Sequence, residues 1–82
     1  MIYAVIDIGS NTVRLSVYKV SDENVINLFN EKEQASLRSY VDNGSLSEKG
    51  IERLINTLRK FKLVVDNFGD IDELHPFATS TI

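Results

Sequence analysis

The chain has 82 residues, 43% of them hydrophobic, with a formal net charge of −3, and this length allows one domain at most. The absence of cysteine excludes disulfides and thiolate metal sites, and the acidic balance argues against binding of a nucleic acid polymer. Without a basic leader or a long apolar run, the sequence predicts a cytoplasmic protein that does not span a membrane.

The first part of the chain predicts three strands in succession. In IYAVIDI (2–8) both sets of alternating positions are largely apolar, which is typical of an interior strand covered on two sides. Residues 13–18 alternate apolar with polar side chains, and DIGSNT (7–12) gives a connection short enough for an antiparallel hairpin. A third strand is predicted from Val25 onward, with charges in its later half that indicate an edge position.

A single helix is predicted over about residues 47–66. Its apolar residues recur at helical spacing and form one stripe: Ile51, Leu54, Ile55, Leu58, Phe61 and Val65. Ser45 opens a capping box of the form Ser-x-x-Glu, and Ser47 is the alternative cap. The stretch Asn67–Asp70 ends the helix, and ELHPFATSTI (73–82) has the β-branched and aromatic content of a fourth strand.

These elements predict an α/β fold with the chain order β-β-β-α-β. A helix between two strands permits a right-handed crossover, so the fourth strand is expected to lie parallel to the first. The first three strands then form an antiparallel meander, and the strand order is 3-2-1-4. One helix covers only one face of such a sheet, although the first strand is apolar on both. We therefore expect residues 1–82 to be a single partial domain, truncated at Ile82, whose open face favours a homodimer.

Asp7 stands at the carboxyl end of the first predicted strand, beside the turn. A hard cation such as Mg²⁺ prefers oxygen ligands and keeps most of its waters, so one carboxylate together with substrate phosphates can hold it. The alternative is a carboxylate that only accepts hydrogen bonds from the turn. Asp7 is therefore the candidate catalytic and metal-binding residue.

The turn formed by Gly9, Ser10, Asn11 and Thr12 is the candidate phosphate site. Its backbone amides lie close together, its side chains add two hydroxyls and an amide, and Arg14 can reach a bound phosphate as a fixed cation. A plain hairpin turn draws on the same residue types, and Arg14 also fits a solvated strand position. Both interpretations stay open on these residues alone.

A second hydroxyl cluster, which includes Thr79 and Ser80, ends the fourth predicted strand. If that strand lies beside the first in parallel, both clusters open at the carboxyl edge of the sheet, where open α/β sheets bind their ligands. The alternative is that threonine occurs here because it favours strands. His75 and the cations of residues 59–62 are assigned to packing or to a solvated surface.

Three blocks of the sequence, DIGSNTVRLSVY, GSLSEKGIERLINTLRKF and ATSTI, resemble one known family. In this order they are similar to the amino-terminal part of the exopolyphosphatase and guanosine pentaphosphate phosphohydrolase family, in the superfamily of sugar kinases, heat-shock chaperones and actin. The resemblance implies an RNase-H-like, actin-like ATPase half-domain. It also implies a hydrolase that releases terminal phosphate from polyphosphate or guanosine pentaphosphate with Mg²⁺.

The resemblance implies a role for each candidate residue. Asp7 would orient metal or water. Gly9 to Thr12 with Arg14 would hold phosphate, and Thr79 and Ser80 would line the opposing wall of the site.

The sequence departs from the family in one place and lacks several of its motifs. Ser36-Leu37-Arg38 stands where family members often carry Arg-Leu-Gly. The family's general-base glutamate, a further arginine and the glycine-rich second phosphate motif would fall beyond Ile82, so the chain alone is expected to be inactive. Two alternatives are a fragment of a sugar-kinase-like ATPase and a non-enzymatic α/β interaction module.

Overall fold

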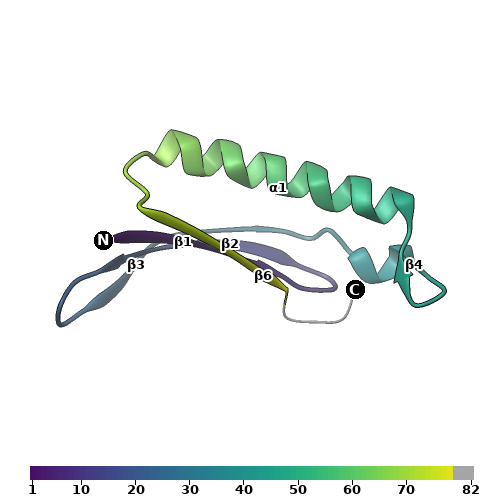
Figure 1. Cartoon of the computed structure of the whole chain (residues 1–82), viewed down its shortest axis with the longest axis horizontal. Coiled ribbons are helices and arrows are strands. Elements are labelled where there is room, and N and C mark those ends of the chain that lie inside the picture. Colours follow the sequence, from purple (N-terminus) through teal and green to yellow (C-terminus); the bar gives the residue numbers. More distant parts are fainter. Residues whose placement is uncertain (79–82) are drawn as a thin grey trace.

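The computed structural model describes residues 1–78, which form a four-stranded sheet with one long helix (Figure 1). The strands of this sheet are β1 (Ile2–Ile8), β2 (Val13–Val20), β3 (Val25–Glu33) and β6 (Glu73–Ala78). Their order is β3-β2-β1-β6, with antiparallel pairing among the first three and with β6 parallel to β1. The predicted α/β fold, the meander and the crossover are therefore confirmed.

Helix α1 (Glu48–Phe68) crosses one face of the sheet (Figure 1). It begins after Ser47, whose hydroxyl accepts a hydrogen bond from the amide of Gly50 at 3.2 Å. Ser47 is therefore the cap, and the predicted capping box on Ser45 is wrong, because that residue pairs within a short strand. The helix ends at Gly69, whose φ of 74° is free of strain only for glycine. None of the helices described combines the length and the apolar character needed to cross a membrane.

Between β3 and α1 the chain forms short elements that the sequence does not predict. A 3₁₀ helix, η1 (Leu37–Tyr40), is followed by a hairpin of β4 (Val41–Asp42) and β5 (Ser45–Leu46). Asn43–Gly44 makes its turn, and both residues have positive φ, 53° and 82°, as a two-residue hairpin turn of this kind demands. Helix α1 lies close on η1, since a Cβ on Gly50 would be 2.7 Å from a side-chain carbon of η1.

The core lies between α1 and one face of the sheet, and its buried side chains are Ala4, Ile6, Val13, Leu15, Val17, Ala35, Leu37 and Phe61. Phe61 is the member that α1 contributes, and it is 1% exposed. The predicted stripe of the helix is only partly correct, because Ile51 and Ile55 are 47% and 42% exposed and Thr57 is buried in their place. The hydroxyl of Thr57 donates to the carbonyl of Arg53 at 3.0 Å, which satisfies it inside the core.

Within residues 1–78 the second face of the sheet has no helix over it (Figure 1). Its side chains include Tyr3, Val5 and Tyr18, which are half-buried. The homodimer expected through this face stays a prediction.

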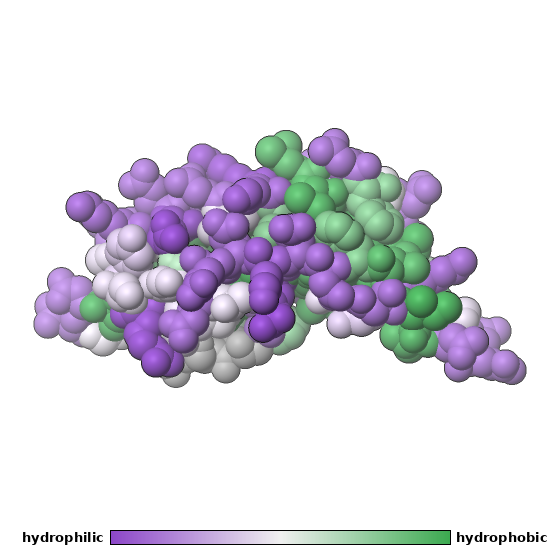
Figure 2. All heavy atoms as spheres, turned by 180° about the vertical axis from the view of Figure 1, so that it is seen from behind, coloured by the Kyte–Doolittle hydropathy of each residue, from purple (hydrophilic) through white to green (hydrophobic). Residues whose placement is uncertain are grey.

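Strand β3 is an edge strand of the described sheet, and its first half exposes apolar side chains. Val25, Ile26 and Leu28 are 68%, 51% and 42% exposed. Figure 2 shows hydrophobic side chains gathered at the end of the molecule where α1 finishes. The register between β2 and β3 shifts between Val17 and Tyr18, which marks a β-bulge.

Replacing Ser47 by alanine is expected to lower the free energy of unfolding by about 1 kcal/mol, because the variant loses the oxygen that satisfies the Gly50 amide. Ser45→Ala, two residues earlier on an exposed strand, should change it by less than about 0.5 kcal/mol. Urea unfolding followed by circular dichroism measures both variants. Equal losses for the two variants would contradict the assignment of the cap to Ser47.

Candidate functional site

The β1–β2 turn is closed by a hydrogen bond from the amide of Gly9 to the carbonyl of Thr12 at 3.0 Å. The carbonyls of Ser10 and Asn11 accept hydrogen bonds from the segment 36–38. Within residues 1–78, the amides of Ser10, Asn11 and Thr12 take no part in the backbone hydrogen bonds that close and support the turn. The carbonyls of Ser10, Asn11 and Thr12 are thus engaged, and the binding of an anion by these amides stays a prediction.

Asp7 is half-buried one residue before the end of β1. Its partners in register are Arg14 on β2 and Phe77 on β6. Partners in register project from the same face of a sheet, and the neighbouring Ile6 faces α1, so Asp7 and Arg14 lie on the face away from the helix. A carboxylate and a guanidinium are therefore neighbours directly beside the turn.

Lys32 extends this row of charges, because it is the partner of Arg14 on β3. Arg14 and Lys32 line an open hollow of about 410 Å³ together with Leu15, Ser16, Asn30 and Glu31. The sequence does not single out Lys32, since a lysine in a charged edge strand is ordinarily a solvated residue. Only its register places it next to the candidate site.

Strand β6 runs to the same edge of the sheet as the turn. Ile8 at the end of β1 is in register with Ala78, the last residue of β6. Because the two strands are parallel, their carboxyl ends meet at one edge. Thr79 and Ser80 follow Ala78 and lie outside the described residues, so their part in the site stays a prediction.

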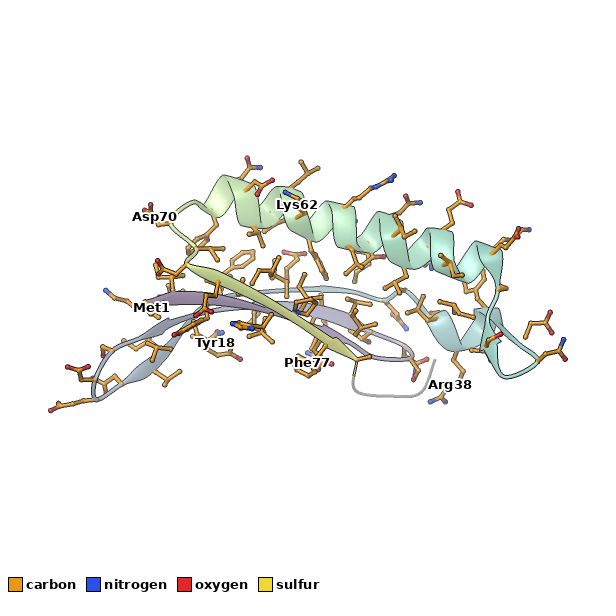
Figure 3. The ribbon with its side chains drawn as sticks, viewed as in Figure 1. Met1, Tyr18, Arg38, Lys62, Asp70 and Phe77 are labelled. Atoms are coloured by element: carbon orange, nitrogen blue, oxygen red, sulfur yellow. The ribbon has the colours of Figure 1, made fainter. Side chains whose placement is uncertain are left out.

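The structure brings to the turn a segment for which the sequence predicts no role. The amides of Ser36 and Arg38 donate to the carbonyls of Asn11 and Ser10, both at 2.9 Å. The guanidinium of Arg38, seen beside the turn end of the sheet in Figure 3, donates to the hydroxyl of Ser10 at 3.2 Å. The one sequence signal for this contact is Leu37, an apolar residue in a polar stretch, which is fully buried.

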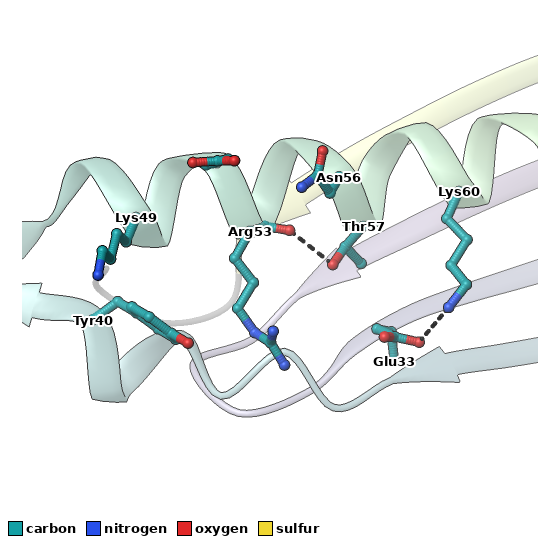
Figure 4. A pocket seen from close by; sticks show the side chains of 8 residues that line it. Glu33, Tyr40, Lys49, Arg53, Asn56, Thr57 and Lys60 are labelled. Carbon is teal, nitrogen blue, oxygen red and sulfur yellow. Dashed lines mark hydrogen bonds and ion pairs between the residues drawn. The ribbon is translucent and has the colours of Figure 1, made fainter.

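Helix α1 holds this segment in place through Arg53 (Figure 4). Its Nε donates to the carbonyl of Ala35, and its Nη2 donates to the carbonyl of Gln34 at 3.4 Å. The guanidinium also lies 5.9 Å from the centre of the Tyr40 ring. Through these contacts Arg53 links the helix to the segment beside the turn.

A groove of about 330 Å³ lies around this link, between α1 and the chain from Glu33 to Tyr40 (Figure 4). Its lining mixes both charges, and the ammonium of Lys60 pairs with the carboxylate of Glu33 at 3.2 Å. No residue of the β1–β2 turn lines it. The candidate site is therefore the turn and not this groove.

Within residues 1–78 no three His, Asp or Glu side chains gather into a cluster that could hold a metal ion. Asp7 offers one carboxylate at the edge of the turn. Mg²⁺ is commonly bound by one or two carboxylates together with phosphate oxygens and waters. This donor set fits a Mg²⁺ that is held mainly by phosphate, and it does not fit one held by the described residues alone.

No protein-family model and no curated protein matches the chain, whereas solved structures match it over nearly its whole length. A member of the Ppx/GppA protein family from Aquifex aeolicus is 32% identical, with a TM-score of 0.82, and the match covers 95% of this chain and 26% of that one. An exopolyphosphatase from Cytophaga hutchinsonii is 27% identical, with a TM-score of 0.85 and coverage of 99% and 26%. An exopolyphosphatase-like protein is 27% identical, with a TM-score of 0.86 and coverage of 98% and 24%.

The strand order and the parallel β6 define an α/β fold that these structures share. Over nearly its whole length the chain resembles the Ppx/GppA family, which confirms the resemblance predicted from its sequence. The chain spans about a quarter of the length of the proteins that it matches, 26% of the Aquifex aeolicus protein.

Arg53→Met is expected to loosen the segment beside the turn, because it removes the hydrogen bonds to Ala35 and Gln34. Hydrogen exchange at the amides of Ser36 and Arg38 should become faster by about tenfold, since each bond contributes on the order of 1 kcal/mol. Arg59→Met, on the exposed side of the same helix, is the matched control and should leave these rates unchanged. Identical rates in the two variants would show that Arg53 does not hold the segment.

Proposed function

We propose that this chain forms the first phosphate-binding part of a phosphohydrolase that releases terminal phosphate from inorganic polyphosphate or guanosine pentaphosphate. The observation that carries the proposal is the parallel register of β6 with β1, which gives the turn and the end of β6 a common edge of the sheet. Open α/β sheets bind ligands at that edge. The similarity to exopolyphosphatase structures supports the same class of reaction.

In this proposal the turn holds the terminal phosphate. The amides of Ser10, Asn11 and Thr12 donate to its oxygens, and Arg14 compensates its charge. Gly9 closes the turn behind them. Enzymes catalyse phosphoryl transfer mainly by positioning the phosphate and stabilising charge on its oxygens, so donors that are fixed before binding are the main contribution of this loop.

Asp7 has one of two roles beside the phosphate. It is one ligand of a Mg²⁺ that is otherwise held by phosphate oxygens and waters, or it orients the attacking water. When bound, the cation neutralises charge on the phosphate oxygens. Thr79 and Ser80 belong to the proposal as the opposing wall.

A phosphoryl-transfer site needs donors on both sides of the transferred group. The turn supplies one side, and the chain spans 26% of the length of the Aquifex aeolicus protein that it resembles. We therefore place the remaining catalytic groups in a larger protein, of which residues 1–82 are a partial domain.

The intact protein that contains this chain is expected to release phosphate from polyphosphate in a Mg²⁺-dependent way, because charge on the phosphate oxygens must be compensated. The isolated 82-residue chain should stay at background in the same colorimetric assay, since it lacks the donors of the second side. Clear turnover by the isolated chain would contradict the proposed division of the site. Hydrolysis of ATP in preference to polyphosphate and guanosine pentaphosphate by the intact protein would instead favour a kinase-like ATPase.

Asp7→Asn in the intact protein is expected to lower kcat by about a hundredfold, because a misplaced metal ion or water costs this much. The variant keeps the shape of the side chain and removes its charge. Asp22→Asn, on the exposed β2–β3 connection, removes the same charge elsewhere and should leave kcat unchanged. Full activity of Asp7→Asn would remove Asp7 from the mechanism.

A further inference from the structure

Arg38 contacts the candidate phosphate turn in two ways, and both contacts are to the same residue. Its backbone amide donates to the carbonyl of Ser10 at 2.9 Å, and its Nη2 donates to the hydroxyl of Ser10 at 3.2 Å. The backbone contact fixes the start of the side chain, and the second contact fixes its head. The guanidinium is therefore placed beside the turn before any ligand binds.

The contact with Arg38 decides what the hydroxyl of Ser10 can do. A serine hydroxyl carries one donor hydrogen and accepts through its lone pairs, whereas a guanidinium only donates. When Ser10 accepts from Arg38, its own hydrogen must point to a different acceptor. Phosphate oxygens are acceptors only, so the pair presents a hydroxyl that is set to donate to them.

The guanidinium of Arg38 also keeps donors of its own. It has five N–H groups, of which the contact with Ser10 uses one, and the residue is exposed. Within residues 1–78 Arg38 forms no ion pair with a carboxylate. An arginine in this state binds a phosphate through two parallel hydrogen bonds more readily than a lysine does.

The backbone that carries Arg38 is held on both sides. Leu37 is fully buried in the core, and the amide of Ser36 donates to the carbonyl of Asn11 at 2.9 Å. Arg53 fixes the two residues that precede this segment. A donor on such a fixed backbone loses little conformational entropy when a ligand binds.

We infer that Arg38 and Ser10 form a coupled pair that binds the phosphate group, with Arg38 as a direct phosphate ligand and as the residue that sets the hydroxyl of Ser10 to donate. This inference rests on the proposed function, because it adds to the same anion site. It assigns a further cation of the site to the segment between β3 and α1, which follows the strand of Arg14 in sequence.

The test is a titration of the 82-residue chain with tripolyphosphate, without Mg²⁺, followed by the amide signals of Gly9 and Asn11 in NMR spectra. Arg38→Met should weaken binding by about tenfold, because it removes a charge-assisted contact with the anion. Arg38→Lys keeps the charge but not the paired donors, so it should weaken binding by about threefold. Arg59→Met removes the same charge from the exposed side of α1 and should change binding by less than about twofold.

A double-mutant cycle separates coupling from two independent contributions. Ser10→Ala alone should weaken binding by about fivefold. The variant with both Ser10→Ala and Arg38→Met should weaken binding by no more than about tenfold relative to the native chain. Effects that multiply to about fiftyfold would overturn the coupling of the pair. Urea unfolding of each variant shows whether the fold is retained, and Arg38→Lys provides the test if Arg38→Met unfolds.

The outcomes distinguish this inference from the proposed function. If the native chain shows no saturable shift with tripolyphosphate, the proposed function and the inference both fail. If the native chain binds and Arg38→Met binds as Arg59→Met does, the inference alone fails. The inference is supported if Arg38→Met weakens binding and the double variant weakens it by less than the product of the two single effects.

Discussion

The parallel pairing of β6 with β1 is the constraint on which the rest of the structure depends. Parallel neighbours cannot be joined by a tight turn, so the chain between them must cross the sheet, and α1 makes this crossing. Phe61 packs the helix into the core. Asp72 then fixes the start of β6, because its carboxylate accepts from the amide of Ile2 at 2.7 Å and its own amide donates to the carbonyl of Ile2 at 2.8 Å. These contacts bring the far ends of β1 and β6 to one edge.

The turn at that edge is supported from behind by a chain of contacts that starts on the helix. Arg53 holds the carbonyls of Gln34 and Ala35, and the residues that follow hold the carbonyls of the turn. Hydrogen bonds from the segment 36–38 fix the carbonyl side of the turn, and the proposed function assigns its amide side to an anion. The position of α1 and the shape of the turn are therefore linked, although the two elements are far apart in sequence.

Much of the fold can be predicted from the sequence, because the strands and the helix carry a period of 2 or about 3.6 residues. The exposed Ile51 and Ile55 show the limit of that signal. Periodicity identifies an apolar stripe, but it does not fix how the helix is rotated about its own axis against the sheet. The side of the helix that faces the protein is less apolar than the stripe, because it includes Gly50, which packs closely on η1, and Thr57, whose hydroxyl is satisfied by the carbonyl of Arg53. The candidate site can be read from the sequence only where it is local, in the turn beside Asp7. The contact of Arg38 with Ser10 joins residues that are 28 positions apart, and no periodic pattern in the sequence predicts it.

Strand β3 exposes apolar side chains in its first half and carries charges in its later half, and this difference affects how the protein behaves at high concentration. Its outer backbone groups offer a template onto which a strand from another molecule can add. Glu31 and Lys32 in the later half oppose such addition through their charges. The half from Val25 to Leu28 has apolar exposure and no charge of its own, so intermolecular β-aggregation of the chain would begin there.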